Sequence, residues 1–493
     1  MAASSALAGD IHWNAASGSW NSATNWNPAT LPGSLDNAVI DFRSGAGTAG
    51  IARVNSDVGR VQQAYVYRGN RVDVVTRGVL RTFADVIVGL GPSDGGGQIT
   101  VSSNSPTFMN PATLEAGRSM QLGVNDGDGR IDQSADIVTV GNHLILGTSN
   151  IPTNPGLPTG IYNLSGGNLT VGGTVFLGAD PSGSVGEFTL SAPAVANVGG
   201  IRGVYTGFFH HLGGEMHVGQ GGLTFPSASG GAFMRYTVHD GEFTSANVTV
   251  NNAGEWEIRG GFVSAGHLVV NGGRVVISEP GPIMIHTLDV QMTDPNPTLP
   301  GFIDVNEGGL TLNSNSTPAE SEAVRVLIQR GYRNGLWTSG GGSDSHRGIT
   351  SRAAGATVGS AHKTALGYGD TLDLFVGEGP TEGGSSIIVK HTFYGDANLD
   401  GRVNLSDFNR LAANFGTSGK FWPQGDFNYD KVVNLADFNL LASNFGMSAA
   451  GPEVTAQDWS RLAAAVPEPA TIGLFGVAAS AAMSRRRRRA APR

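Results

Sequence analysis

The 493-residue chain contains no cysteine, which excludes disulfides, thiolate zinc sites and a cysteine nucleophile. The fold therefore cannot depend on the redox state of its compartment. Charged residues make up only 14 % of the chain, and the formal net charge is −9. Because nucleic-acid binding needs a basic surface, this composition predicts no nucleic-acid partner.

Long amphipathic helical patterns are missing before about residue 400, whereas glycine, at 74 residues, has about twice its usual share. Alternating apolar residues and Gly-Gly or Asp-Gly turns predict short strands between about Ile137 and Val290. A period of 20 to 27 residues predicts stacked coils. We expect a mainly β fold with a parallel β-solenoid body, and a β-sandwich pair is the alternative architecture. The five clearest repeats begin at Tyr162, Phe188, Phe209, Tyr236 and Trp256.

The first 50 residues carry two further signals. Residues 1–9 are interpreted as the remnant of a signal peptide, because Ala6-Leu7-Ala8 has the small-x-small pattern that signal peptidase accepts. Residues 10–50 contain Trp13, Trp20 and Trp26, and this stretch resembles the opening motif of autotransporter-type β-helix passengers. We expect these aromatic residues to cap the first coil rather than to stack on sugars.

Residues 396–407 match the spacing of a calcium-binding loop. Calcium takes six to eight oxygen ligands, which such a loop supplies from side chains, from one backbone carbonyl and from a closing carboxylate. Gly401 stands where the loop makes its sharp turn and glycine adopts positive φ without steric cost. The predicted ligands are Asp396, Asn398, Asp400, Arg402 by its carbonyl, Asn404 and Asp407.

The same pattern returns thirty residues later, which makes a chance match improbable. Lys431 replaces the turn glycine in this copy, and it adds both a steric cost for positive φ and a nearby positive charge, so we expect the second site to be weaker. The predicted ligands are Asp426, Asn428, Asp430, Val432 by its carbonyl, Asn434 and Asp437. The sequence therefore predicts two bound calcium ions.

Each loop is followed by apolar residues at helical spacing, and Gly416 and Gly446 end the two predicted helices. The paired loop-helix pattern resembles a type I dockerin over residues 395–446. The resemblance implies two calcium ions and docking onto a cohesin-like module of a partner protein. The implied partner contacts are Leu405, Ser406, Leu435 and Ala436. Calcium binding that only stabilises the fold, with no cohesin partner, is the alternative.

The last 28 residues contain three signals in a fixed order: Pro467-Glu468-Pro469, an apolar stretch from Ala470 to Met483, and an arginine run from Arg485 to Arg489. The arginine run would stay cytoplasmic and leave the motif on the outer side. This tail resembles the PEP-CTERM sorting signal, which implies processing by an exosortase-type enzyme. We expect a secreted or envelope-surface protein, anchored transiently or stably by the C-terminal helix.

The sequence predicts an exported surface or matrix protein with a structural or attachment role and no catalytic activity. The alternative is a glycan-binding or polysaccharide-degrading β-helix protein, since dockerins often accompany carbohydrate-active enzymes, and a surface polysaccharide is a possible partner. The predicted domain order is signal remnant (1–9), Trp-motif cap (10–50), solenoid repeats (51–320), irregular β closing segment (321–393), dockerin-like module (394–447), spacer (448–465) and sorting signal (466–493).

Overall fold

The structure is a computed structural model. It describes residues 9–42, 49–91, 96–103, 111–125, 127–148, 158–179, 183–227, 231–279, 283–290, 301–313, 317–337, 348–374 and 385–448. The interpretations of residues 1–8, of residues 449–465 and of the sorting signal therefore fall outside the described residues. Contacts divide the chain into two compact units: residues 1–358 with 368–391, and residues 359–367 with 392–493.

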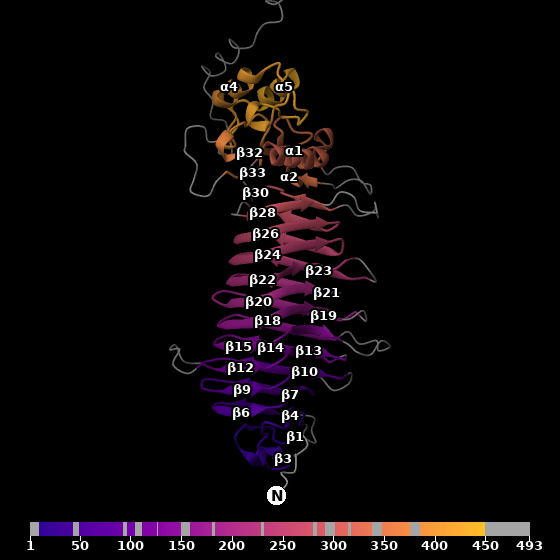
Figure 1. The fold of residues 1–493 in the computed structure, drawn as a ribbon, viewed down its shortest axis with the longest axis vertical. Helices are drawn as coiled ribbons and strands as arrows, with labels where there is room; N and C mark the ends of the chain where they lie inside the picture. Colours follow the sequence, from indigo (N-terminus) through magenta and orange to yellow (C-terminus); the bar gives the residue numbers. More distant parts are fainter. Residues whose placement is uncertain are drawn as a thin grey trace, which may run out of the picture. The chain divides into compact units, whose positions relative to one another are not determined.

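The first unit is a stack of parallel strands, as the repeats predict (Figure 1). Thirteen of the described strands form one continuous sheet with one strand per coil. These are β2 (Ser17–Ser19), β5 (Ile51–Val54), β8 (Arg71–Val74), β11 (Gly97–Val101), β14 (Gly129–Gln133), β17 (Thr159–Leu164), β19 (Val185–Leu190), β21 (Thr206–His211), β23 (Phe233–Val238), β25 (Gly254–Ile258), β27 (Arg274–Ile277), β29 (Phe302–Asp304) and β31 (Gly348–Thr350).

The second sheet contributes two further strand positions to each early coil. One position is taken by β1 (Asp10–Trp13), β4 (Asn37–Ile40), β7 (Gln63–Val66), β10 (Val86–Leu90), β13 (Met120–Val124) and β16 (Leu144–Thr148). The other is taken by β6 (Asp57–Val61), β9 (Val79–Thr82), β12 (Thr113–Ala116) and β15 (Ile137–Val140). From β18 on, both positions lie on one long strand, because β18 pairs with β15 through its first half and with β16 through its second.

These long strands are β18 (Asn168–Leu177), β20 (Val195–Gly203), β22 (Glu215–Thr224), β24 (Glu242–Asn251), β26 (Phe262–Asn271) and β28 (Ile283–Val290). In the ladders between β18, β20, β22 and β24, an irregularity such as the one between Val171 and Thr174 separates the two halves. The body is therefore a three-sided parallel β-solenoid, which confirms the predicted architecture.

The five repeats found in the sequence lie in register. Tyr162 pairs with Phe188, Phe188 with Phe209, Phe209 with Tyr236, and Tyr236 with Trp256. All five rings are fully buried, and the ring centroids of the first three pairs are 5.2, 4.6 and 4.3 Å apart. The first two pairs are stacked and the third is tilted by 32°, and such aromatic contacts add to the free energy gained by burial, so this column forms the centre of the core.

The N-terminal end of the solenoid is closed by the predicted tryptophans. Trp13, Trp20 and Trp26 are each 1 to 2 % exposed, and Trp26 contacts the other two rings edge-on. The helical turn η1 (Ala23–Asn25) leads into β3 (Trp26–Asn27), which pairs antiparallel with β1. Because the rings are buried, they present no face to a sugar. The parallel ladder already starts at Asp10, inside the segment expected to be a separate cap.

The C-terminal end of the solenoid differs from the expected irregular β segment, because it contains helix α1 (Pro318–Tyr332). A capping box starts this helix: Thr317 accepts from the Glu320 N–H, and Glu320 accepts from the Thr317 N–H. The other elements are β30 (Gly309–Leu312), η2 (Arg333–Gly335), α2 (Arg352–Ala356), β32 (Thr364–Asp370), α3 (Thr371–Leu374) and β33 (Ile387–Phe393). Strand β33 pairs antiparallel with β30, so each end of the solenoid carries an antiparallel strand.

Glycines with positive φ form one corner of the solenoid. Gly89, Gly123, Gly147 and Gly178 follow Val88, Leu122, Leu146 and Leu177, residues that stack in register. A Cβ on Gly123 would lie 2.4 Å from the carbonyl oxygen of Thr159, so the corner requires glycine both for its backbone angle and for close approach of the chain. This column explains part of the glycine content.

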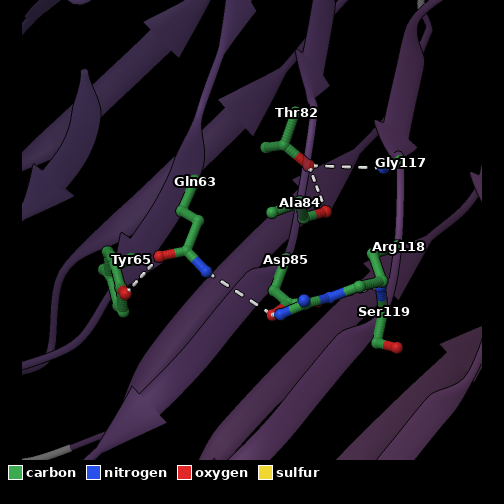
Figure 2. A network of polar contacts seen from close by, with 8 residues as sticks. All are labelled: Gln63, Tyr65, Thr82, Ala84, Asp85, Gly117, Arg118 and Ser119. Carbon is green, nitrogen blue, oxygen red and sulfur yellow. Dashed lines mark hydrogen bonds and ion pairs between the residues drawn. The ribbon is translucent and has the colours of Figure 1, made fainter. Parts of the chain in front are cut away.

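A buried carboxylate links three consecutive coils near the N-terminal end. Figure 2 shows Asp85 between Gln63 of the preceding coil and Arg118 of the following one. Asp85 is 3 % exposed and accepts from the Arg118 guanidinium, from the Ser119 N–H at 3.0 Å and from the Gln63 amide at 3.5 Å. Tyr65 donates to the Gln63 carbonyl oxygen at 2.6 Å. Hydrogen bonds to a buried charge are among the stronger ones in proteins.

We predict that Asp85→Ala lowers the free energy of unfolding of the body by about 2 kcal/mol, because the Ser119 N–H loses its acceptor and the Arg118 guanidinium its counter-ion. Chemical denaturation followed by far-UV circular dichroism measures this change. The matched control is Asp57→Ala, whose half-exposed side chain pairs with Arg81 and should contribute below about 0.5 kcal/mol. Equal losses in both variants would contradict the assigned role of Asp85.

His211 is a titratable side chain inside the solenoid core. It stacks in register between Leu190 and Val238, and its ring nitrogens lie 3.2 Å from the Gly214 carbonyl oxygen and 3.4 Å from the Tyr236 hydroxyl. Burial lowers the pKa of His211 to about 4, although the Gly214 carbonyl and the Asp240 charge act in the opposite direction.

We predict that the body loses roughly 3 kcal/mol of stability as the pH falls from 6.5 to 4, because over this range the imidazole is protonated in the unfolded chain but not in the folded one. Above pH 6.5 the imidazole is neutral in both states, so none of this stability is lost. In His211→Leu, which continues the Leu190 and Val238 column, this part of the pH dependence should disappear. Denaturant titrations of both proteins at pH 7, 5.5 and 4 test this, and parallel pH profiles would contradict it.

Candidate metal centre

The second unit contains the two predicted helices, α4 (Leu405–Asn414) and α5 (Leu435–Asn444), and the helical turn η3 (Trp422–Gln424) between them. Each helix follows one of the predicted calcium loops. Asn404 and Asn434 cap the helices, and Asp407 and Asp437 complete capping boxes by accepting from the N–H of the capping asparagine. The last predicted ligand of each loop is therefore also a residue of the first helical turn, and the capping box holds its carboxylate in place.

The first loop is folded around two buried carboxylates. Asp396 accepts from the N–H groups of Asp400 at 3.2 Å and Gly401 at 3.0 Å, and it also accepts from the Thr392 hydroxyl. Asp407 accepts from the N–H groups of Ala397 at 2.9 Å and Asn404 at 2.9 Å. Both aspartates are 0 % exposed. The first and last loop positions are therefore brought together by main-chain donors.

The second loop repeats these contacts thirty residues later. Asp426 accepts from Asp430 at 3.1 Å and from Lys431 at 2.9 Å, and Asp437 accepts from Phe427 at 2.9 Å and from Asn434 at 3.0 Å. Asp426 and Asp437 are also 0 % exposed. The sequence repeat is thus a repeat of geometry.

The remaining predicted ligands lie on the outer part of each loop. The Asn398 amide donates to Asp400 at 2.9 Å, and Asn428 donates to Asp430 at the same distance. Asp400 and Asp430 are exposed, whereas Asn398, Asn404, Asn428 and Asn434 are half-buried. Arg402 and Val432, both exposed, follow the turn and are the predicted carbonyl donors.

The two loops are tied to each other's helices. The Val403 N–H donates to Met447 after α5, and the Val433 N–H donates to Thr417 after α4. Phe408 and Phe438, thirty positions apart, meet edge-on with ring centroids 6.4 Å apart. The two halves of the unit are therefore related by a pseudo-twofold arrangement in which neither half is complete alone.

Trp422 lies in the core between the loops. Its ring is fully buried, its Nε1 donates to the Asp396 carbonyl at 2.7 Å, and its ring centroid is 5.0 Å from Phe427 and 5.7 Å from Tyr429. The Tyr429 hydroxyl in turn donates to the Leu366 carbonyl at 2.8 Å. The aromatic core therefore connects both loops to β32, which contains Leu366.

Residues 359–367 also belong to this unit, although they were expected in the closing segment of the solenoid. Besides the Tyr429 contact, the Asn444 amide donates to the Lys363 carbonyl at 2.9 Å. No residue pattern marks this segment, because its contacts are made mostly through its main chain. The equivalent residue of the other half, Asn414, is also an asparagine. The sequence therefore does not show that only Asn444 binds residues 359–367.

The electrostatics of the loops favour a bound cation. Burial raises the pKa of Asp407 to about 7, and the charges of Asp396 and Asp400 act in the same direction. Burial likewise raises the pKa of Asp426 to about 7, together with the charges of Asp437 and Asp430. Without a counter-ion, each loop gathers buried negative charge at a cost in free energy.

The donor chemistry fits calcium. Every predicted ligand is a carboxylate, an amide or a backbone carbonyl, which are the oxygen ligands that a hard divalent cation prefers. Within the described ranges, no three His, Asp or Glu side chains form a metal-binding cluster by themselves. The asparagine amides and the carbonyls of Arg402 and Val432 are thus needed to complete each set. A bound ion would place a positive charge beside the buried aspartates.

The sixth loop position differs between the copies. Gly401 has φ +83° and Lys431 has φ +70°, so lysine takes the strained left-handed conformation that the sequence predicts. The Lys431 ammonium lies 5.7 Å from the centre of the Phe421 ring. Attraction to the ring offsets part of its cost.

We predict that Lys431→Gly raises the free energy of unfolding of the second unit by about 1 kcal/mol, because glycine adopts positive φ without strain. The mirror-image variant, Gly401→Lys, should lower it by a similar amount, since a Cβ at Gly401 meets no atom within 4 Å and only backbone strain is added. Denaturation followed by the helical circular dichroism signal measures both. Changes of the same sign would contradict the assignment.

The four predicted partner contacts lie at the first two positions of each helix. Leu435 is 61 % exposed, Ser406 and Ala436 are exposed, and Leu405 is half-buried. The two copies thus present different surfaces, and partner binding at either one stays a prediction.

Comparison with protein families identifies a PEP-CTERM protein-sorting motif at residues 465–489. The motif indicates export and sorting to the cell envelope, as the Pro-Glu-Pro, apolar and arginine segments predict. PEP-CTERM motifs are processed by exosortase, which is consistent with an exosortase-type enzyme as a partner. No curated protein and no solved structure matches the chain.

None of the helices in the described ranges is long and apolar enough to cross a membrane. The expected C-terminal helix, Ala470–Met483, lies outside those ranges. Membrane anchoring by this segment stays a prediction.

Proposed function

We propose that the exported protein is a surface or matrix component that attaches to a partner through a calcium-dependent docking module of the dockerin kind. The module comprises the two loop-helix repeats between Gly395 and Gly446. One calcium ion binds each loop, and the partner carries a cohesin-like module. The solenoid acts as a stalk.

The observation that carries this proposal is the repetition of the loop contacts at an offset of thirty residues. Both loops place a buried aspartate at the first and last positions, and main-chain N–H groups hold all four carboxylates in place. Such conservation of contacts between two copies favours one shared role for both loops. Oxygen ligands and buried negative charge support calcium as the ion.

The proposed role is structural and non-catalytic. The outward side chains of the thirteen-stranded sheet include neutralising contacts between coils, such as those of Glu255 with Arg235 at 3.3 Å and with Arg274 at 3.6 Å. A glycosidase or lyase needs carboxylates or basic groups that are free to act on a substrate. These paired charges instead support a role in holding adjacent coils together.

We predict that calorimetric titration of calcium into the full chain gives a stoichiometry of about two, with a gain in helical circular dichroism as binding stabilises the module. The double variant Asp396→Ala, Asp426→Ala should lose both sites, and each single variant should lose one. Asp289→Ala, which removes an exposed aspartate from the solenoid, is the matched control and should leave the titration unchanged.

Unchanged calcium binding in the double variant would overturn the proposed sites. A pull-down with cohesin-like modules tests the docking role. If the loops bind calcium but the chain captures no such module, the loops have a structural role only, and the docking role is overturned.

A further inference from the structure

The ends of α4 and α5 are covered unequally, although they occupy equivalent places in the two repeats. Phe445, after α5, is 4 % exposed, whereas Phe415, after α4, is 49 % exposed. The backbones agree: Met447 donates to Asn444 at 2.9 Å and Thr417 to Asn414 at 3.1 Å, and each phenylalanine N–H donates to an alanine carbonyl at 3.4 Å. The difference therefore comes from what packs against each end.

At the end of α5, the cover is a segment of the chain itself, the bend that leads into β32 (Thr364–Asp370). The Asn444 amide donates to the carbonyls of Lys363 and Tyr394, each at 2.9 Å, and accepts from the Lys363 N–H at 3.2 Å. His362 lies 3.0 Å from the Ser443 carbonyl oxygen. Strand β32 begins at the next residue, Thr364. One asparagine thus holds the main chain of an incoming strand.

The end of α4 has the same asparagine without the strand. The Asn414 amide donates at 2.8 Å to the Arg410 carbonyl of its own helix. Among the described residues, no segment lies on this amide as Lys363 lies on Asn444. Turning the Asn414 side chain outward would present the donor and acceptor that Asn444 presents.

The surface around Asn414 is neutral along one stretch of the chain and is bordered by Arg410, Lys420 and Lys431. Residues 411–419 contain no charged side chain. Val432, 38 % exposed, belongs to the loop that pairs antiparallel with Ser418, and Leu435, 61 % exposed, follows it at the start of α5. Because the equivalent end of α5 is covered by a stretch of polypeptide, a polypeptide segment is the occupant that this surface fits.

We propose that Asn414, Phe415, Val432 and Leu435 form a docking face that binds the main chain of a short segment of a partner protein, in the way that the end of α5 binds His362 and Lys363. The inference rests on the proposed function only in that the docking module must be folded. It makes attachment one-sided, because the equivalent face of the second repeat is already covered by this chain.

The test uses the full chain, labelled with ¹⁵N, in saturating calcium. The probe is a synthetic peptide with the sequence of residues 359–368, the segment that covers the end of α5. We expect the peptide to shift the amide signals of Asn414, Phe415 and Leu435 in a saturable way. Phe415→Ser should weaken this binding by about tenfold or more, as expected for loss of a central aromatic contact.

Asn409→Ala is the matched control. Asn409 is exposed on the same helix, five positions before Asn414 and thus about 140° around it, so the variant should bind the peptide as the parent chain does. Calcium titration of both variants should match that of the parent, which shows that the module remains folded.

A peptide that produces no shifts, equal binding in Phe415→Ser, or shifts centred on Asn444 would overturn the inference while calcium binding still stands. A concentration-dependent dimer that is lost in Phe415→Ser would also overturn it, because the occupant would then be a second copy. If calcium does not bind, the proposed function fails. The docking face is then tested on the calcium-free chain, by the same shifts of the Asn414, Phe415 and Leu435 amide signals on addition of the peptide.

Discussion

In-register parallel pairing is the constraint on which the solenoid depends. It places equivalent residues of successive coils directly over one another, so each column must be filled by side chains that tolerate copies of themselves at about 4.8 Å spacing. Buried rings from Tyr162 to Trp256 fill one column, and the corner glycines from Gly89 to Gly178 fill another. Like charges in register repel and need a counter-ion: Arg60 lies over Arg81, and both contact Glu115.

Some columns of the solenoid alternate in charge. Arg53 lies over Asp73, and Arg235 and Arg274 lie on either side of Glu255. Asp85 achieves the same at a buried position, where Arg118 supplies the counter-ion. The proposed calcium loops instead bring aspartate and asparagine oxygens together in each repeat, and this set of oxygen donors is the reason to assign them a metal ion.

Much of this organisation is visible in the sequence, because repetition is visible there. The repeats starting at Tyr162 to Trp256 predicted the stacking, and the recurrence of Asp396 at Asp426 predicted two equivalent loops. Helix α1 was not predicted, because its apolar residues are only weakly concentrated on one face. Thr317, Pro318 and Glu320 nevertheless match the pattern of a capping box. The role of residues 359–367 could not be predicted, since a main-chain contact leaves no residue pattern.

The most direct test of the central claim is differential scanning calorimetry of the full chain in calcium and in chelator. Calcium should raise the midpoint temperature of the transition with the smaller enthalpy, which belongs to the module. It should leave the transition of the solenoid, which has the larger enthalpy, unchanged. Identical scans in the two conditions, or a shift of the larger transition alone, would contradict it.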